Sequence, residues 1–499
     1  MRESGVLLPI FSLPSRFGIG CFSKEAYEFV DQLEKAGQSR WQILPLGPTG
    51  YGDSPYQSFS TFAGNPYFID LEMLAEEGLL TETECTQADF GEKEEEIDYE
   101  KLYKQRFHVL KKAFVRFEKS KEKQEKDYEN FVRTNRDWLE DYCLYMAIKD
   151  SLGGISWIEW PKELRDREEQ ALKCARLELA EEIRFYRFQQ YEFDKQWKKL
   201  HRYANEHGIR IIGDIPIYVA FDSADTWANP ELFQFDENNL PTGVAGCPPD
   251  GFSATGQLWG NPLYRWEYHK KTGYDWWMKR IAYSFQLYDA VRIDHFRGFD
   301  EYYAIPYGEK TAVNGTWMPG PGIEFFRTVE EKLGHLDIIA EDLGFLTDTV
   351  LNLLSGTGFP GMKVVQFAFD SREAANYLPH TYTQNCVVYT GTHDNTTTRD
   401  WYHTVSKECR DFAKEYLCKS ALDEDQLAWD FIAMAMGSVA DLCIIPLQDY
   451  LCLGAEARIN TPSTLGGNWV WRMKKGQLDE ALVRKIHKVT KLYGRLTEK

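Results

Sequence analysis

Short, almost continuously apolar runs recur along this 499-residue chain, and turn residues bound them. Runs of this kind predict strands that are covered on both faces, as in a parallel sheet. Eight segments fit the pattern: 5–10, 41–46, 209–215, 290–296, 337–343, 361–369, 386–392 and 442–447. Helical periodicity appears between several of them, at 23–36, 325–333 and 347–354. This alternation predicts an α/β fold, a (β/α)8 TIM barrel.

Two gaps between the predicted strands are too long for a simple crossover. After the second strand, residues 98–208 are charged, poor in glycine and helical in period, so we expect a mainly helical insertion over residues 72–205. After the third strand, we expect a loop-rich insertion over residues 221–285. Its central part, 248–266, combines Gly, Pro and aromatic residues without periodicity, which suggests an ordered loop over the barrel mouth.

The segment after the eighth predicted strand is short. Only a loop at 455–471 and one closing helix at 478–493 remain there. This leaves no room for a C-terminal β domain. We therefore expect residues 1–499 to form a single catalytic barrel.

Composition and charge narrow the possible partners. Hydrophobic residues make up 43% of the chain and aromatic residues 15%, so a large folded core is expected and not a disordered chain. Lys and Arg number 58 against 77 for Asp and Glu, which gives a net charge of −19. This charge disfavours nucleic acid and anionic membranes as partners. A neutral substrate is more compatible with this net charge. The aromatic side chains could stack on the flat faces of sugar rings.

The sequence signals neither export nor metal binding. The first residues, MRESGVLLPIF, lack a cationic region followed by a long apolar stretch, and no run approaches the length of a membrane span. A cytoplasmic protein is therefore expected. Ten cysteines, from Cys21 to Cys452, show neither C-x-x-C nor paired Cys and His spacings. We expect reduced, mostly buried thiols and no zinc site or disulfide framework.

Four of the predicted strands end on a carboxylate: Asp214, Asp294, Glu341 and Asp394. A parallel barrel builds its active site at the C-terminal ends of its strands, so these carboxylates are expected to meet there. Side-chain alternation places Arg292 and Asp294 on one face of the fourth strand. The guanidinium would keep the carboxylate ionised and oriented, as a nucleophile requires. A structural ion pair inside the barrel is the alternative.

The fifth and seventh strands add further candidates. Alternation puts Glu341 at the barrel mouth and Asp342 on the opposite face, so Asp342 is expected to be structural. An apolar strand end raises a carboxyl pKa by desolvation, which suits a group that donates and later withdraws a proton. His393 beside Asp394 could bind substrate hydroxyls or be a core histidine. Most enzymes that cleave a glycoside use two carboxylates that flank the scissile bond.

Together these motifs resemble a known family. The order of the four carboxylate segments is similar to the four conserved regions of the α-amylase superfamily. Matching stretches run through nearly the whole chain: LPSRFGIG, WQILPLGPTGYGDSPYQSFSTFAGNPYFIDL, the 248–266 segment, RIDHFRGF, AEDLG, TGTHDN and LGGNWVWRM. Their amino-acid sequences resemble those of 4-α-glucanotransferases of the amylomaltase (disproportionating enzyme) type, glycoside hydrolase family 77. Small departures, such as Thr396 and Thr397, do not involve the carboxylates.

The resemblance implies a role for individual residues. Asp294 would be the nucleophile, Glu341 the general acid and base, and Asp394 a third carboxylate that binds and distorts the sugar at the cleavage site. Tyr56 would stack under that sugar, and Tyr51 would belong to a second glucan-binding groove. The full substrate-binding set would be Tyr56, Ser54, Asp214, Gln257, Trp259, Arg292, His393 and Tyr51. No metal and no organic cofactor is implied.

The activity implied by the resemblance is that of a retaining 4-α-glucanotransferase of starch or glycogen metabolism. It would transfer α-1,4-glucan segments between malto-oligosaccharides through a covalent glycosyl-enzyme on Asp294. Its partners would be a glucan donor and acceptor, with no nucleic acid and no membrane, and the protein would be a monomer or a homodimer. Two alternatives stay open: an α-1,4-glucan hydrolase of the same superfamily, and a non-catalytic glucan-binding barrel.

Overall fold

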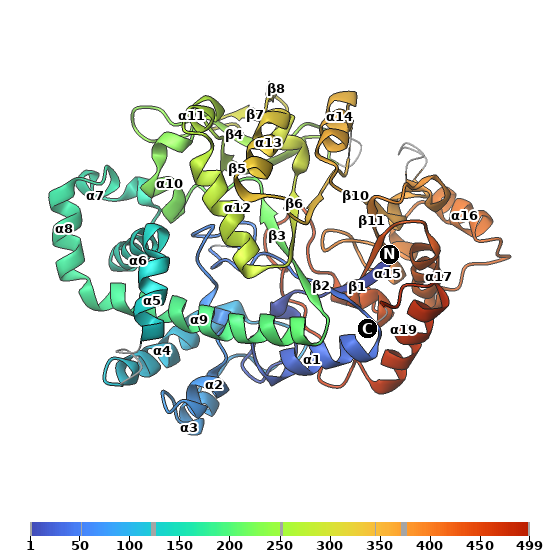
Figure 1. Ribbon diagram of the computed structural model, residues 1–499, viewed down its shortest axis with the longest axis horizontal. Coiled ribbons are helices and arrows are strands. Elements are labelled where there is room, and N and C mark those ends of the chain that lie inside the picture. Colours follow the sequence, from blue (N-terminus) through green and yellow to red (C-terminus); the bar gives the residue numbers. More distant parts are fainter. Residues whose placement is uncertain are drawn as a thin grey trace.

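The fold is described from a computed structural model of the chain. It describes residues 2–50, 52–120, 126–249, 253–344, 346–370 and 377–497. Helices surround a central barrel, and a group of further helices lies to one side of it (Figure 1).

Within the described residues, eight parallel strands form the barrel. They are β1 (Glu3–Leu7), β2 (Arg40–Gln42), β3 (Arg210–Pro216), β6 (Ala290–Asp294), β9 (Ile338–Ala340), β10 (Gly361–Val364), β11 (Cys386–Tyr389) and β12 (Leu442–Pro446). Their hydrogen-bonded order is β10-β11-β12-β1-β2-β3-β6-β9, which follows the chain. The Ala340 N–H donates to the Pro360 carbonyl (3.0 Å) and joins β9 to the start of β10. The predicted (β/α)8 barrel is confirmed, and each of its strands lies at one of the predicted apolar runs.

Amphipathic helices cover the outside of the barrel. They include α1 (Lys24–Lys35), α9 (Ala180–Glu206), α12 (Asp275–Leu287), α13 (Gly322–Leu333), α14 (Asp348–Thr357), α17 (Glu424–Gly437) and α19 (Glu480–Leu492). In α1, Ala26, Phe29, Val30 and Leu33 are buried, which is the spacing of a single apolar helix face. Sequential neighbours such as α12 and α13, and α13 and α14, contact each other, and α19 returns to α1. Helices that are neighbours in the chain thus lie side by side around the barrel, and the last of them meets the first.

From Leu71 onward, the chain between β2 and β3 is mainly helical. It contains α2 (Leu71–Glu76), α3 (Glu82–Thr86), α4 (Tyr99–Phe117), α5 (Lys126–Thr134), α6 (Arg136–Ser151), α7 (Lys162–Arg165) and α8 (Glu169–Glu178), and then α9. Figure 1 shows α4 to α8 gathered on one side of the barrel. The long helix α9 leads back to β3, and its Trp197 donates a hydrogen bond from Nε1 to the Leu287 carbonyl (3.1 Å). The subdomain bounds 72–205 and 221–285 stay predictions.

A second, antiparallel sheet lies near β6 and α13 (Figure 1). Its order is β5-β4-β7-β8, from β4 (Gly243–Cys247), β5 (Gln257–Pro262), β7 (Glu301–Pro306) and β8 (Thr316–Pro319). The sequence predicted an ordered loop over 248–266, so β5 is a correction. On its other edge β4 pairs with β7, which comes after β6 in the chain. Because β4 and β7 are far apart in sequence, no hairpin motif predicts that they pair.

The remaining α-helices are short, and all of them except α16, which comes after α15, come next in the chain after a strand. They are α10 (Ala224–Ala228), α11 (Trp266–Lys271), α15 (Thr398–Thr404), α16 (Lys407–Tyr416) and α18 (Leu447–Tyr450). Each of α10 and α15 begins at a capping hydroxyl, since Ser223 accepts from the Thr226 N–H and Thr397 from the Asp400 N–H. Such caps satisfy backbone donors that a helix start leaves unpaired.

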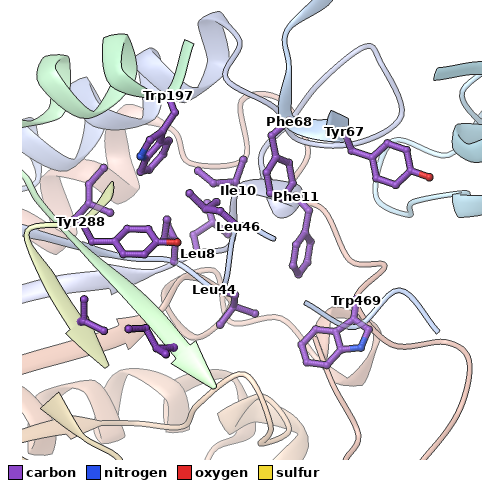
Figure 2. Close-up of a cluster of buried hydrophobic side chains, with 14 of the residues drawn as sticks. Leu8, Ile10, Phe11, Leu44, Leu46, Tyr67, Phe68, Trp197, Tyr288 and Trp469 are labelled. Atoms are coloured by element: carbon purple, nitrogen blue, oxygen red, sulfur yellow. The ribbon is translucent and has the colours of Figure 1, made fainter. Parts of the chain in front are cut away.

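The segments that follow β1 and β2 pack into one apolar cluster. Figure 2 shows Leu8 and Ile10, which follow β1, gathered with Leu44 and Leu46, which follow β2. All four are buried, and burying an aliphatic side chain contributes about 1.5–3 kcal/mol each. Trp469 lies at the edge of the same view and belongs to the same cluster. This cluster anchors the segments that follow β1 and β2.

Two sequence predictions concern the chain as a whole. In the part of the chain that the structure describes, no helix is long and apolar enough to cross a membrane. The ten cysteines are all free, and five of them are buried: Cys21, Cys85, Cys143, Cys386 and Cys443. Cys174 and Cys418 are exposed.

Candidate active site

The predicted carboxylates lie at the C-terminal ends of barrel strands. Asp214 is in β3, Asp294 ends β6, Glu341 follows β9 and Asp394 follows β11. The strands β3, β6 and β9 are adjacent, so the first three carboxylates lie side by side along one wall of the barrel mouth. This arrangement is the one that a barrel enzyme uses to build its site.

A buried arginine joins two of these carboxylates. Arg292 faces Asp214 across the β3–β6 ladder, and its Nη1 lies 2.9 and 2.7 Å from the two oxygens of Asp214. Its Nη2 lies 3.0 Å from Oδ1 of Asp294. Burial by itself lowers the pKa of Arg292, but the charges of Asp214 and Asp294 raise it well above its usual range. The guanidinium therefore stays charged and holds both carboxylates in place.

Asp214 is a support buried beneath the site. Besides Arg292, it accepts a hydrogen bond from the Tyr56 hydroxyl to Oδ2 (2.9 Å). Burial raises the pKa of the Asp214 carboxyl, and the Arg292 guanidinium opposes that shift. Its oxygens are occupied by protein donors, so Asp214 fixes Arg292 and Tyr56 and leaves Asp294 as the more exposed carboxylate, with 27% of its side chain accessible.

Glu341 is held by backbone donors. The His295 N–H donates to Oε2 (2.8 Å) and the Leu343 N–H to Oε1 (3.0 Å). The pKa of Glu341 is raised to about 7, because the effects of burial and of the Asp294 charge exceed the opposing effects of the Arg292 charge and the two N–H groups. The adjacent Asp342 is buried and accepts from the Met362 N–H (2.6 Å). A carboxyl that titrates near neutrality suits general acid and base work.

Asp394 lies on the opposite side of the mouth, after β11. Its Oδ1 accepts from Asn460 Nδ2 (2.6 Å) and lies 3.4 Å from His393 Nε2. Its backbone carbonyl accepts from Arg458 Nη2 (3.0 Å). His393 is buried, and burial lowers the pKa of its ring. With 43% of its side chain exposed, Asp394 is fixed on one oxygen and open to the barrel mouth.

Aromatic rings line the wall between Asp214 and Asp394. The Tyr56 ring stacks on His393, with centroids 5.2 Å apart and planes at 15°. Trp469 tilts against both rings, at 5.8 Å from Tyr56 and 6.0 Å from His393. Sequence reasoning missed Trp469, Arg458 and Asn460, all in the predicted loop 455–471. The loop's Asn and Trp residues after a predicted barrel strand were the available signal.

The remaining predicted residues lie in the turn before Tyr56 and in strand β5. Ser54 Oγ accepts from the Tyr56 N–H (3.3 Å), so it shapes the turn before Tyr56. In β5, Trp259 donates from Nε1 to Gln257 Oε1 (3.1 Å), and its ring lies edge-on to His295 at 4.8 Å. The prediction for Tyr51 lies outside the described residues. Among the residues that are described, no group of three or more His, Cys, Asp or Glu side chains is arranged to hold a metal ion.

A family model described as 4-alpha-glucanotransferase matches residues 8–479. The chain belongs to this family. The 4-alpha-glucanotransferase of Clostridium butyricum is 50% identical over 488 residues, 97% of this chain and 99% of that protein. The chloroplastic/amyloplastic 4-alpha-glucanotransferase of Solanum tuberosum is 40% identical over 504 residues, 99% of this chain and 87% of that protein.

A solved structure agrees with the family assignment. The amylomaltase from Streptococcus agalactiae in complex with acarbose has a TM-score of 0.96 and 43% identity, and each chain is covered to 100%. The transferase prediction is therefore confirmed over the hydrolase and the non-catalytic alternatives. The chain is an enzyme of the 4-alpha-glucanotransferase family.

Proposed function

We propose that this 4-alpha-glucanotransferase acts on malto-oligosaccharides by a retaining, two-step mechanism, with Asp294 as nucleophile and Glu341 as general acid and base. The observation that carries the proposal is the electrostatic pairing of two carboxyls on adjacent strands. Burial and the charge of Asp294 raise the pKa of Glu341 to about 7. Two carboxyls with divided roles are what glycoside cleavage requires.

In the first step, an Asp294 oxygen attacks the anomeric carbon of the donor. The glycosidic bond breaks, and Glu341 gives its proton to the departing 4-oxygen. Arg292 holds the Asp294 carboxylate in position from Nη2 (3.0 Å). The products are a covalent glycosyl-enzyme and a shortened glucan, and Glu341 is left as a carboxylate.

In the second step, the 4-hydroxyl of an acceptor attacks the same carbon. Its proton passes to Glu341, its oxygen bonds to the sugar, and the ester bond to Asp294 breaks. While Asp294 is esterified, it carries no charge, so one cause of the raised pKa of Glu341 is absent. The Glu341 carboxyl is then more readily ionised, as a base should be. The donor configuration is retained because it is inverted twice.

The other predicted residues would bind the glucan. Asp394, braced by Asn460 at 2.6 Å, would accept hydrogen bonds from the 2- and 3-hydroxyls of the sugar at the cleavage point. Tyr56, stacked on His393, would present a flat ring to that sugar. Trp259 and Gln257 would contact the neighbouring sugar, and Ser54 would contribute through the turn that it shapes. For Tyr51, we keep the proposal of a second glucan-binding groove.

The test is a product profile from maltotriose. Transfer predicts free glucose and longer maltodextrins at constant total reducing ends, whereas hydrolysis raises reducing ends steadily. Asp294→Asn and Glu341→Gln should each remove most of this activity, because the first lacks the nucleophile and the second lacks the general acid and base. Full activity in either variant would refute its assigned role.

A further inference from the structure

The end of β6 contains a one-residue irregularity. The β6–β9 ladder is regular as far as the hydrogen bond from the Glu341 N–H to the Ile293 carbonyl (3.0 Å). If the parallel ladder continued regularly, the next hydrogen bond would run from the N–H of residue 295 to the Glu341 carbonyl. That carbonyl instead accepts from the Phe296 N–H (3.1 Å). His295 is therefore an extra residue, a β-bulge at the site.

The bulge releases one backbone donor, and that donor points at Glu341. His295 has a left-handed backbone (φ 51°, ψ 52°), which is uncommon for a residue with a Cβ atom. Its N–H donates to Oε2 of Glu341 (2.8 Å), while the Leu343 N–H donates to Oε1 (3.0 Å). Each oxygen of the carboxyl thus has its own backbone donor, one from each of two adjacent strand ends.

We propose that His295 is a positioning residue for Glu341, which acts through its backbone: the left-handed bulge aims the His295 N–H at Oε2 and sets the orientation of the acid and base. This inference rests on the proposed function, because it requires Glu341 to be the acid and base. In this proposal the backbone of His295, the residue after the nucleophile, positions Glu341, and the His295 side chain does not.

The imidazole ring does not account for the arrangement. It lies edge-on to Trp259, and burial lowers the pKa of His295 to about 4. The ring is therefore neutral near pH 7, and replacing it removes no charge from the surroundings of Glu341. The charged groups that act on Glu341 are Arg292 and Asp294 of β6, and both remain in every variant of residue 295.

Two variants of similar size separate the backbone from the ring. His295→Asn and His295→Val both lack the imidazole. Asn adopts left-handed backbone readily, whereas the β-branched Val disfavours it. A difference between these two variants therefore reports the backbone and not the lost ring. His295→Gly and His295→Ala form a second pair on the same principle, and they decide the question if the Val variant does not fold.

The first readout is the pH profile of kcat/KM for maltotriose. A hydrogen bond to a carboxylate favours its charged form, so loss of the His295 donor raises the pKa of Glu341. The alkaline limb of the Val variant should lie about one pH unit above that of the Asn variant. At pH 6, kcat should be about tenfold lower in the Val variant than in the Asn variant, because the carboxyl is less well oriented.

The second readout uses α-maltosyl fluoride with sodium azide. Fluoride leaves as an anion without a proton, and azide attacks the glycosyl-enzyme without a base, so this reaction bypasses Glu341. The Asn and Val variants should release fluoride at the same rate within twofold. Equal loss of both reactions in the Val variant would mean general damage to the site and would overturn the inference, as would identical pH limbs.

Glu341→Gln distinguishes this inference from the proposed function. It should lose activity on maltotriose and keep fluoride release with azide. If it keeps its activity on maltotriose, the proposed function is wrong. If it loses that activity while the two variants of each His295 pair behave alike, only the role of the bulge is wrong.

Discussion

Asn460 offers a direct test of how the loop after β12 supports the site. Its Nδ2 donates to Oδ1 of Asp394 at 2.6 Å. A hydrogen bond to a charged group contributes about 1.5–3 kcal/mol. The Asp394 side chain is 43% exposed, so solvent screening places the expected loss at the lower end, about 1.5 kcal/mol. Asn460→Ala should therefore lower kcat/KM for maltotriose disproportionation by about tenfold.

The assay is the initial rate of glucose release from maltotriose, with thermal unfolding of each variant as the check on folding. Thr464→Val is the matched control, because Thr464 lies on the exposed part of the same loop and bonds only to loop atoms, the Thr461 carbonyl and Asn468. It should stay within twofold of the unsubstituted protein. Asn460→Asp should lose more than the Ala variant, since it places a second negative charge beside Asp394. If Asn460→Ala keeps kcat/KM within twofold, the bracing of Asp394 contributes nothing to the reaction.

Three further predictions follow from the geometry. In the proposed mechanism Glu341 must be protonated to act as the acid, and burial raises its pKa to about 7, so kcat/KM should fall as the pH rises through 7; a flat profile to pH 9 would contradict this. Gly213→Ala should lower the free energy of unfolding by about 1–3 kcal/mol, because its Cβ would lie 2.1 Å from the Tyr288 ring; an unchanged denaturant midpoint would refute it. Trp259→Leu should increase water attack relative to transfer, since it removes a ring from the rim beside His295; reducing ends that stay constant would count against it.

The barrel could be predicted because its strands are covered on both faces. Runs such as 209–215 and 386–392 are apolar throughout, and this pattern belongs to strands in parallel sheets. The carboxylates proposed to be catalytic stand at the ends of such runs, so Asp294 and Glu341 were accessible to the same reasoning. Local alternation placed Glu341 and Asp342 on opposite faces. In the structure Asp342 is buried, and the charge of Asp294 acts on the pKa of Glu341.

The features that were missed depend on contacts between distant segments. Asn460 reaches Asp394 across 66 residues of sequence, and no periodicity marks a loop residue for such a contact. The strand β4 pairs with β7, which lies after β6 in the chain. No turn motif between neighbouring segments therefore predicts this pairing. The bulge at His295 shifts a ladder by one residue while the apolar pattern of β6 stays unchanged. Each of these is a property of the assembled barrel and not of a single segment.

The central claim is that Asp294 forms the covalent glycosyl-enzyme, and trapping tests it most directly. In the Glu341→Gln variant, α-maltosyl fluoride needs no acid for the first step, but the second step lacks its base, so the intermediate should accumulate. After an acid quench and digestion with pepsin, mass spectrometry should find one maltosyl group on the peptide that contains Asp294. The label should be absent when Asp294→Asn is added. A label on Asp394 or another residue, or fluoride release without any labelled peptide, would contradict the account.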